Sequence, residues 1–552
     1  MPCRGRTDHR KVSFQKDKNK KAGIPKEFQP SLYKVLIRCG RRRPDSYRQS
    51  VLYIHCLIIY NLLVLLGDWS KNAKFFSLSL RISQGFHFLA FLFFLLVCFC
   101  GWRVAKKFGV VTLDQIFFHL MAPMDGMDRE LVVWGIRYTA ITLGIIALYY
   151  ILAFSRVAAR VLAKVHIRRP ESPCWHSVIG AIFFCIALVF AHVRYDAYAY
   201  FWAKESSFIK DNYAKFSAED VHFPVKKNAV ILVLESIGNL YNNTEVFPEP
   251  LLPRLQGVQR ENLSFENQKQ VYGTGWTIAG LTSYLFGLPL LLFKNQGNVL
   301  FDDFMPSAVC GLSILEGNGY SIEYVLSSSA IFAGTDKMFV SHSKAFVQDS
   351  KYLDKYKPKD ATGIWGVPDS FMYQWARGRY SELSKLEKPF ALIVQSIDTH
   401  GYDGFVEKKN VRHGDFRDVL AAADDMACDF IEWLKQQENF EDTVIIVLGD
   451  HLTGQNPLYD KYLLPNQSRR TISNAFINVV PQQNVDRKRL CTSMDMAPTI
   501  LEAMGAVLPQ HRLGLGTSLF SSEKTLIEKL GEEALNEELK KKSDFYKDLF
   551  YK

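Results

Sequence analysis

Four long apolar runs in the first 195 residues constrain this chain more than any other feature, because they require a membrane. Their ranges are 51–67, 86–102, 131–154 and 175–193, and a helix that crosses a bilayer takes roughly 17–25 mostly apolar residues. After residue 200 no comparable run occurs, and short strand-like and helix-like patterns alternate as in a water-soluble domain. The first run starts too late for a cleaved signal peptide, and no small-residue cleavage pattern follows it.

These patterns predict five regions along the chain. We expect a basic cytoplasmic tail at 1–50, a transmembrane domain of four or five α-helices at 51–195 and a linker at 196–224. An α/β domain with a mainly parallel central sheet follows at 225–515, and a charged helical tail at 516–552. Apolar residues at helical spacing over 419–434 predict one helix that covers the sheet.

Positively charged residues predict the orientation in the membrane. Residues 1–50 carry 15 Lys and Arg against 4 Asp and Glu, which accounts for the whole formal net charge of +11. This tail has no zinc, helix-turn-helix or aromatic-basic pattern, so a cytoplasmic segment beside anionic lipid is favoured over a nucleic-acid-binding arm. The basic loop 156–169 also predicts a cytoplasmic position, which places the residues after 200 outside the cytoplasm.

The predicted sides of the membrane for the basic tail and for the soluble domain conflict. Four crossings would leave both on the same side of the membrane. A fifth crossing or re-entrant segment within 110–123 would remove the conflict, although that stretch is short and carries Asp114 and His119.

Candidate metal ligands follow two apolar runs of the α/β domain. Glu235 follows V-I-L-V-L, and Asp450 and His451 follow the run 443–448 after one glycine. Such runs suit buried parallel strands, and ligands bind outside the carboxyl ends of the strands in an open α/β sheet. A single carboxylate at a strand end is as readily a helix cap as a ligand, so the combination of both ends is what favours a metal site.

A third apolar run, 389–397, ends in Asp398, Thr399 and His400. A histidine at this place can protonate a leaving alkoxide or activate an attacking hydroxyl. The alternative is a structural histidine that is hydrogen-bonded within its loop.

A hydroxyl-bearing turn precedes another apolar stretch at Gly273-Thr274-Gly275-Trp276-Thr277. A hydroxyl at a helix N-terminus faces unpaired N–H groups and the positive end of the helix dipole, which suits phosphate or an alkoxide. Thr277 is the candidate nucleophile and Thr274 competes with it. An ordinary N-cap threonine is the alternative, since such caps are common.

Five segments in the second half of the chain together resemble a known family. They are V-L-E-S, G-T-G-W-T-I-A-G, F-A-G-T-D, D-T-H-G-Y-D-G-F and V-L-G-D-H, and S-M-D-M-A-P-T-I-L-E-A-M-G follows them. In this order, over about 225–510, they resemble the sulfatase-type branch of the alkaline phosphatase superfamily. Within it the chain is most similar to membrane-bound enzymes of the phosphoglycerol transferase I type, and more distantly to lipoteichoic acid synthases and phosphoethanolamine transferases.

The resemblance implies a sulfatase-like fold and one divalent metal ion held by Glu235, Thr277, Asp450 and His451. It also implies that Thr277 is the nucleophile and that His400 contacts the phosphoryl group and the acceptor. A glycine ten residues after Thr277 resembles one in true sulfatases, which favours Thr277 over Thr274. Oxygen ligands with a single imidazole suit Mn²⁺ or Mg²⁺, and Zn²⁺ is an alternative.

Three departures from the family narrow the expectation. The chain lacks the Cys/Ser-x-Pro-x-Arg signature of formylglycine sulfatases, and it lacks an obvious second set of Asp and His ligands for a two-metal phosphatase. The stretch that resembles the phosphate clamp of lipoteichoic acid synthases, 332–337, has no arginine. We therefore expect substrate contacts from Trp276, Asp336 and Lys337, with His342 as an alternative to Lys337.

The expected function is transfer of a phospholipid head group, phosphoglycerol, through a phospho-threonine intermediate to a cell-envelope glycan. Phosphoethanolamine transfer to lipopolysaccharide and phosphodiester hydrolysis are the alternatives. The expected location is a bacterial inner membrane, with several crossings and a periplasmic catalytic domain, and no nucleic acid is expected as a partner.

Overall fold

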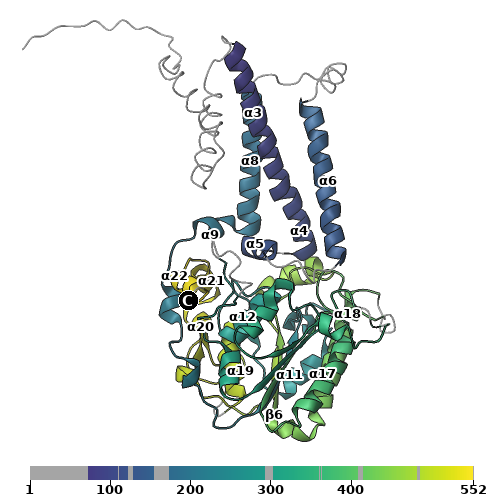
Figure 1. Cartoon of the computed structure of the whole chain (residues 1–552), viewed down its shortest axis with the longest axis vertical. Coiled ribbons are helices and arrows are strands. Elements are labelled where there is room, and N and C mark those ends of the chain that lie inside the picture. Colours follow the sequence, from purple (N-terminus) through teal and green to yellow (C-terminus); the bar gives the residue numbers. More distant parts are fainter. Residues whose placement is uncertain are drawn as a thin grey trace, which may run out of the picture. The chain divides into compact units, whose positions relative to one another are not determined.

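The structure, a computed structural model, describes residues 73–109, 111–121, 129–154, 173–292, 303–359, 361, 363–407, 414–481 and 485–550 (Figure 1). The chain divides into two compact units. One comprises 1–98 with 142–189, and the other comprises 99–141 with 190–552. The basic tail, the first apolar run and the loop 156–169 lie outside the described residues, so the expectations about them stay predictions.

Long apolar helices make up the N-terminal part. They are α3 (Ala73–Phe94), which continues through a π-helical stretch (Leu95–Cys100) into α4 (Gly101–Phe108), then α6 (Arg129–Phe154) and α8 (Pro173–Tyr195). In the described part of the chain, three stretches are long and apolar enough to cross a membrane: Ser79–Val104, Val132–Leu152 and Trp175–Tyr195. They confirm three of the four predicted runs as long apolar helices.

The helices of the first unit contact one another through polar and aromatic side chains. The hydroxyl of Ser177 donates to that of Ser83 at 3.1 Å, and the rings of Phe91 and Tyr149 stack with centroids 3.7 Å apart. Small hydroxyl residues between helices are typical of membrane bundles, because lipid offers buried polar groups no partners.

The segment considered as a fifth crossing forms the short helix α5 (Leu113–Met121). Its 9 residues extend over only about 13 Å, whereas the bilayer core is about 30 Å thick. Phe118 of this helix is fully buried in a core cluster of the second unit. The residues of α5 therefore pack against protein, and the number of membrane crossings stays a prediction.

A six-stranded sheet forms the centre of the second unit, in the order β4-β3-β5-β1-β6-β7. All neighbours pair in parallel except β6 and β7, which are antiparallel. The strands are β1 (Asn228–Leu234), β3 (Ser321–Leu326), β4 (Phe346–Gln348), β5 (Phe390–Gln395), β6 (Thr443–Gly449) and β7 (Asn474–Ile477). The three apolar runs named from the sequence are thus three adjacent strands, β5, β1 and β6.

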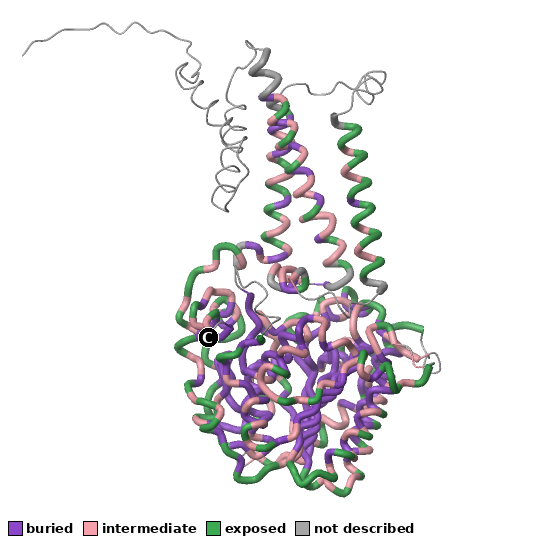
Figure 2. The backbone as a smooth tube through the Cα atoms, in the orientation of Figure 1, coloured by how far each residue is buried: buried purple, intermediate pink, exposed green. Residues whose placement is uncertain are grey.

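Helices cover both faces of this sheet, as Figure 1 shows. Side chains of β1 alternate between two core clusters: Ala229, Ile231 and Val233 enter one, and Val230, Leu232 and Leu234 enter the other. The first cluster includes α12 (Thr277–Phe286), α14 (Gly311–Gly317) and α19 (Ser493–Ala503); the second includes α11 (Pro253–Glu261), α17 (Asp369–Leu383) and α18 (Phe416–Lys435). Figure 2 shows the central strands as buried, and α18 confirms the predicted covering helix.

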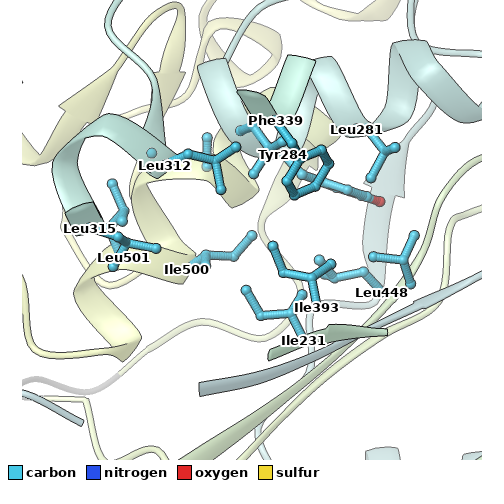
Figure 3. Close-up of a pocket in the computed structure, with 14 residues that line it drawn as sticks. Ile231, Leu281, Tyr284, Leu312, Leu315, Phe339, Ile393, Leu448, Ile500 and Leu501 are labelled. Atoms are coloured by element: carbon cyan, nitrogen blue, oxygen red, sulfur yellow. The ribbon is translucent and has the colours of Figure 1, made fainter. Parts of the chain in front are cut away.

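An apolar cavity lies between the sheet and α12. Tyr284, Leu281, Ile231 and Ile393 point into a cavity of about 30 Å³ (Figure 3). An apolar cavity of this kind stays dry, so it is a packing defect of the core and no place for phosphate chemistry.

The C-terminal residues form three short helices, α20 (Leu526–Leu530), α21 (Glu532–Leu539) and α22 (Asp544–Asp548). Tyr546 and Leu535 are fully buried, and the Tyr546 hydroxyl donates to the carbonyl of Pro289 at 2.6 Å. The charged C-terminal segment is helical, and its apolar residues complete the core. Two small sheets join β2 (Asn267–Lys269) to β8 (Leu490–Thr492) and β9 (Arg512–Leu513) to β10 (Gly516–Thr517).

Candidate active site

Three strand ends meet at the carboxyl edge of the sheet. The N–H of Asp450, after β6, donates to the carbonyl of Leu234 in β1 at 3.0 Å. The hydroxyl of Thr399, after β5, donates to the carbonyl of Glu235 at 2.6 Å. The strand register thus brings together residues that lie more than two hundred positions apart in the sequence.

Glu235, Asp450 and His451 form a buried cluster at this edge. Their ligand atoms lie within 4.8 Å of one another. His451 Nε2 is 3.4 Å from Glu235 Oε1 and 3.6 Å from Asp450 Oδ2. Neither carboxyl group has any solvent exposure.

This cluster fits a divalent cation. Asp450 Oδ1 accepts from the N–H groups of Ser236 and His451, both at 2.7 Å. Asp450 Oδ2 is buried and, among the described residues, receives no hydrogen bond. A buried carboxylate oxygen without a donor is costly unless a cation or a proton compensates it, and two carboxylates with one imidazole are a common donor set for divalent metals.

The protonation of the three groups depends on their mutual charges. Burial, reinforced by the charge of Glu235, raises the pKa of Asp450 to about 7. Burial alone would lower the pKa of His451, but the charges of Asp450 and Glu235 raise it to about 9. Burial would raise the pKa of Glu235, yet the charges of His400 and His451 hold it well below its usual range. The protonation state of each group thus depends on the charges of the other two.

Thr277 is the first residue of α12 and contacts this cluster. Its hydroxyl donates to Glu235 Oε2 at 3.2 Å. The N-cap is Trp276, whose side chain makes no capping hydrogen bond, so Thr277 is not an ordinary N-cap. Gly280 allows the close approach of α12 to β6, because a Cβ there would lie 2.3 Å from the carbonyl oxygen of Asp450.

Thr274, the competing threonine, has a structural environment. It is fully buried, its hydroxyl donates to the carbonyl of Val271 at 2.9 Å, and it accepts from the N–H of the same residue at 3.1 Å. Both hydrogen bonds close the turn before α12. The geometry therefore favours Thr277 over Thr274 as the nucleophile.

His400 lies beside the cluster, on the loop after β5. Its ring packs edge-on against Trp365 with centroids 4.4 Å apart, and its charge acts on Glu235. Asp369 holds the start of this loop, accepting from the N–H groups of Ile397 and Asp398, both at 2.9 Å. The sequence analysis did not predict Trp365 or Asp369 as site residues. Neither follows one of the three apolar runs: Trp365 lies in the loop before α17, and Asp369 is the first residue of α17.

The other residues predicted to contact substrate lie outside the cluster of Glu235, Asp450 and His451. Trp276 Nε1 is buried and, in the described part of the chain, has no hydrogen-bond partner. Asp336 and Lys337 lie in the first turn of α15 (Thr335–Val340), and burial raises the pKa of Asp336. His342 contacts the carbonyl of Phe304 at 2.6 Å and the hydroxyl of Ser313 at 3.3 Å, which gives it a structural role. Their part in substrate binding stays a prediction.

Comparison with known proteins now identifies the family. The sulfatase family matches residues 227–506, which is half of the chain and contains the sheet and every residue of the cluster. The chain belongs to the sulfatase family.

Among curated proteins, the chain is 31% identical to phosphoglycerol transferase I of Escherichia coli over 312 residues, which cover 54% of this chain and 39% of that protein. It thus matches about two fifths of the length of this relative. Among solved structures, a protein in the alkaline phosphatase superfamily from Vibrio parahaemolyticus is similar at 22% identity and a TM-score of 0.43, covering 56% of this chain and 72% of that one. Phosphoethanolamine transferase A from Neisseria meningitidis is similar at 13% identity and 0.44, covering 88% and 96%.

Proposed function

We propose that this protein transfers the phosphoglycerol head group of a membrane phospholipid to a cell-envelope glycan through a phospho-threonine intermediate. The observation that carries the proposal is the contact of Thr277 with Glu235, within the cluster that includes Asp450 and His451. A hydroxyl at a helix N-terminus beside a cation site suits nucleophilic attack on phosphorus. Similarity to phosphoglycerol transferase I supports the choice of head group.

Glu235, Asp450, His451 and the Thr277 hydroxyl would hold one divalent cation, Mn²⁺ in our proposal, with Mg²⁺ and Zn²⁺ as alternatives. Such a cation lowers the pKa of a hydroxyl and neutralises charge on the phosphoryl oxygens. We propose that side chains of the protein carry out the nucleophilic attack and the proton transfers.

The Thr277 alkoxide attacks phosphorus, the Oγ–phosphorus bond forms, and the bond between phosphorus and the diacylglycerol oxygen breaks. The His400 imidazolium protonates the departing diacylglycerol oxygen and becomes neutral. In the second half, a glycan hydroxyl loses its proton to neutral His400 and attacks phosphorus, and Thr277 Oγ leaves as the alkoxide, which restores both groups. Covalent catalysis of this kind replaces one difficult displacement by two easier ones. Trp276, Asp336 and Lys337 would contact the substrate.

A membrane location follows from this donor. The three apolar stretches suit an enzyme whose donor is a lipid, and we propose an inner-membrane protein with several crossings and a periplasmic catalytic domain. Substrate would then reach the site from the outer leaflet of that membrane.

The test uses the full chain in membranes, with Mn²⁺ and either phosphatidylglycerol or phosphatidylethanolamine labelled in the head group. We expect diacylglycerol release from phosphatidylglycerol and, by mass spectrometry, a glycerophosphate adduct on the peptide that contains Thr277. Thr277→Ala should abolish both, whereas Thr244→Ala, at an exposed threonine of the same unit, should change neither.

Each other outcome has a definite meaning. Release from phosphatidylethanolamine alone would replace the proposed donor, and release that added glycan does not accelerate would indicate a hydrolase. Equal release by Thr277→Ala, or an adduct on another residue, would overturn the nucleophile.

A further inference from the structure

The short helix α5 carries one more histidine toward the proposed site. In the sequence α5 lies between two candidate membrane spans, Ser79–Val104 and Val132–Leu152. In the fold it belongs to the second unit, together with the catalytic residues. The residues that α5 contacts show whether this helix only links two membrane spans or also takes part in the site.

Several contacts fix this segment on the second unit. The N–H of Thr112 donates to the side chain of Gln115 at 2.9 Å, and the N–H of Gln115 donates back to the Thr112 hydroxyl at 3.4 Å, which is a reciprocal cap. Arg194 donates to the carbonyl of Gly109 at 2.8 Å. A Cβ on Gly109, whose φ is +79°, would lie 1.9 Å from the carbonyl oxygen of Gly454, three residues after His451. The start of α5 thus abuts the loop that follows the metal ligands.

The aromatic residues of α5 point to the surroundings of Thr277. Phe118 has no solvent exposure, and its ring centroid is 6.4 Å from that of Trp276, the residue before Thr277. The ring of His119 stacks on Phe332 with centroids 5.7 Å apart and planes 14° from parallel. The charges of His119 and His400 also act on each other. α5 therefore places Phe118 beside Trp276 and places His119 beside Phe332 and within the electrostatic reach of His400.

The loop that carries Phe332 is itself held in an unfavourable conformation. Ala333 has φ +62°, in the left-handed region that residues with a Cβ avoid. Backbone strain of this kind persists where surrounding contacts over-determine it, and it concentrates at ligand sites. Asp336 and Lys337, which the proposed function assigns to substrate binding, follow this residue directly. The contact of His119 with Phe332 therefore places α5 beside a segment proposed to bind substrate.

We infer that α5 forms part of the donor-binding surface and that His119 contacts the hydroxyl-bearing head group of the phospholipid donor. The inference rests on the proposed function. The His119 side chain is accessible to solvent, so it can reach a bound molecule. A neutral imidazole offers one donor and one acceptor, which suits a glycerol hydroxyl.

The experiment measures steady-state kinetics of the full chain on short-chain phosphatidylglycerol, with Mn²⁺, for wild type, His119→Ala and His119→Gln. A lost hydrogen bond to the head group should raise KM roughly tenfold and leave kcat nearly unchanged. His119→Gln, which keeps a donor and an acceptor, should recover most of the affinity. His222→Ala, at an exposed histidine of the same unit, is the matched control and should match wild type.

The double variant His119→Ala, Phe332→Ala tests whether the stacked pair acts together. We expect its KM to rise less than the product of the two single effects, because residues in contact are not additive. Thermal unfolding of each variant, unchanged from wild type, excludes a folding defect.

Failure of the inference and failure of the proposed function are distinguishable. If wild type releases no diacylglycerol from phosphatidylglycerol, the function is wrong. If wild type reacts through Thr277 and His119→Ala has wild-type KM, the inference is wrong. A loss confined to kcat, with KM unchanged, also overturns head-group contact.

Discussion

Asp450 and Asp369 are buried carboxylates of one unit that differ in their hydrogen bonds. Both oxygens of Asp369 accept hydrogen bonds, from Ser327 and the N–H groups of Ile397 and Asp398. Asp450 uses only Oδ1 among the described residues. The hydrogen bonds of Asp369 hold a loop of the fold, whereas Asp450 Oδ2 is the oxygen that we propose binds the metal ion.

Asp450→Asn should therefore raise the thermal stability of the metal-free protein while it abolishes activity. The substitution removes a charge that burial and Glu235 disfavour, and removing such repulsion stabilises a functional site. Differential scanning fluorimetry in EDTA would show a melting temperature a few degrees higher. Asp369→Asn is the control: it should lose about 1–3 kcal/mol, because an amide donor then faces backbone donors. A lower melting temperature for Asp450→Asn would contradict the metal assignment.

Metal affinity should rise with pH. Without metal, the pKa of Asp450 is about 7 and that of His451 is about 9, so both groups bind protons at pH 6. A cation needs the ionised carboxylate and the neutral imidazole, and it must displace those protons. We expect the Mn²⁺ association constant to increase about tenfold per pH unit for each proton displaced. Titration calorimetry in buffers of different ionisation enthalpy would measure both affinity and proton release. An affinity constant that stays flat from pH 6 to 9 would refute this linkage.

At the scale of elements, the position of α12 against the end of β6 decides where Thr277, the proposed nucleophile, lies. Gly280 sits where a Cβ would meet the backbone of Asp450, whereas a Cβ on Gly257, in α11, would meet nothing within 4 Å. The two glycines occupy helices on opposite faces of the same sheet.

Gly280→Ala should push α12 away from the cluster and lower kcat strongly, with a loss of stability. Gly257→Ala should keep activity and gain up to about 1 kcal/mol, the usual difference between Gly and Ala in a helix. Turnover and chemical denaturation of both variants would measure the contrast. Full activity in Gly280→Ala would show that the spacing of α12 and β6 does not matter.

At the scale of the whole molecule, the two compact units should respond separately to metal. Ligand binding stabilises the state that binds it, by about 2.7 kcal/mol at a hundred times Kd. We expect Mn²⁺ to slow hydrogen exchange in peptides from 228–236 and 443–451 and to leave 175–189 unchanged. Mass spectrometry of the full chain would measure this, and Asp450→Asn should show no protection. Equal protection in both units would mean that metal orders the whole chain.

The sequence alone determined much of this protein, through patterns that are local. Apolar runs long enough for a bilayer predicted helices that the structure confirms over 86–102, 131–154 and 175–193. Runs too apolar for exposed strands predicted β1, β5 and β6, and the residues after them are Glu235, His400, Asp450 and His451. Parallel strands leave their carboxyl ends on one edge, so the meeting of these residues was foreseeable.

Only the tertiary structure decided what depends on contacts between distant segments. Thr274 and Thr277 stand in the same turn, and their hydrogen bonds, to Val271 and to Glu235, distinguish them. The short segment 113–121 could not be interpreted from hydropathy, because an apolar helix packs equally well on lipid or on protein. The burial of Phe118 in the core of the second unit shows that this helix packs on protein. Local periodicity specifies an element and its apolar face, whereas the partner of that face is set by the rest of the fold.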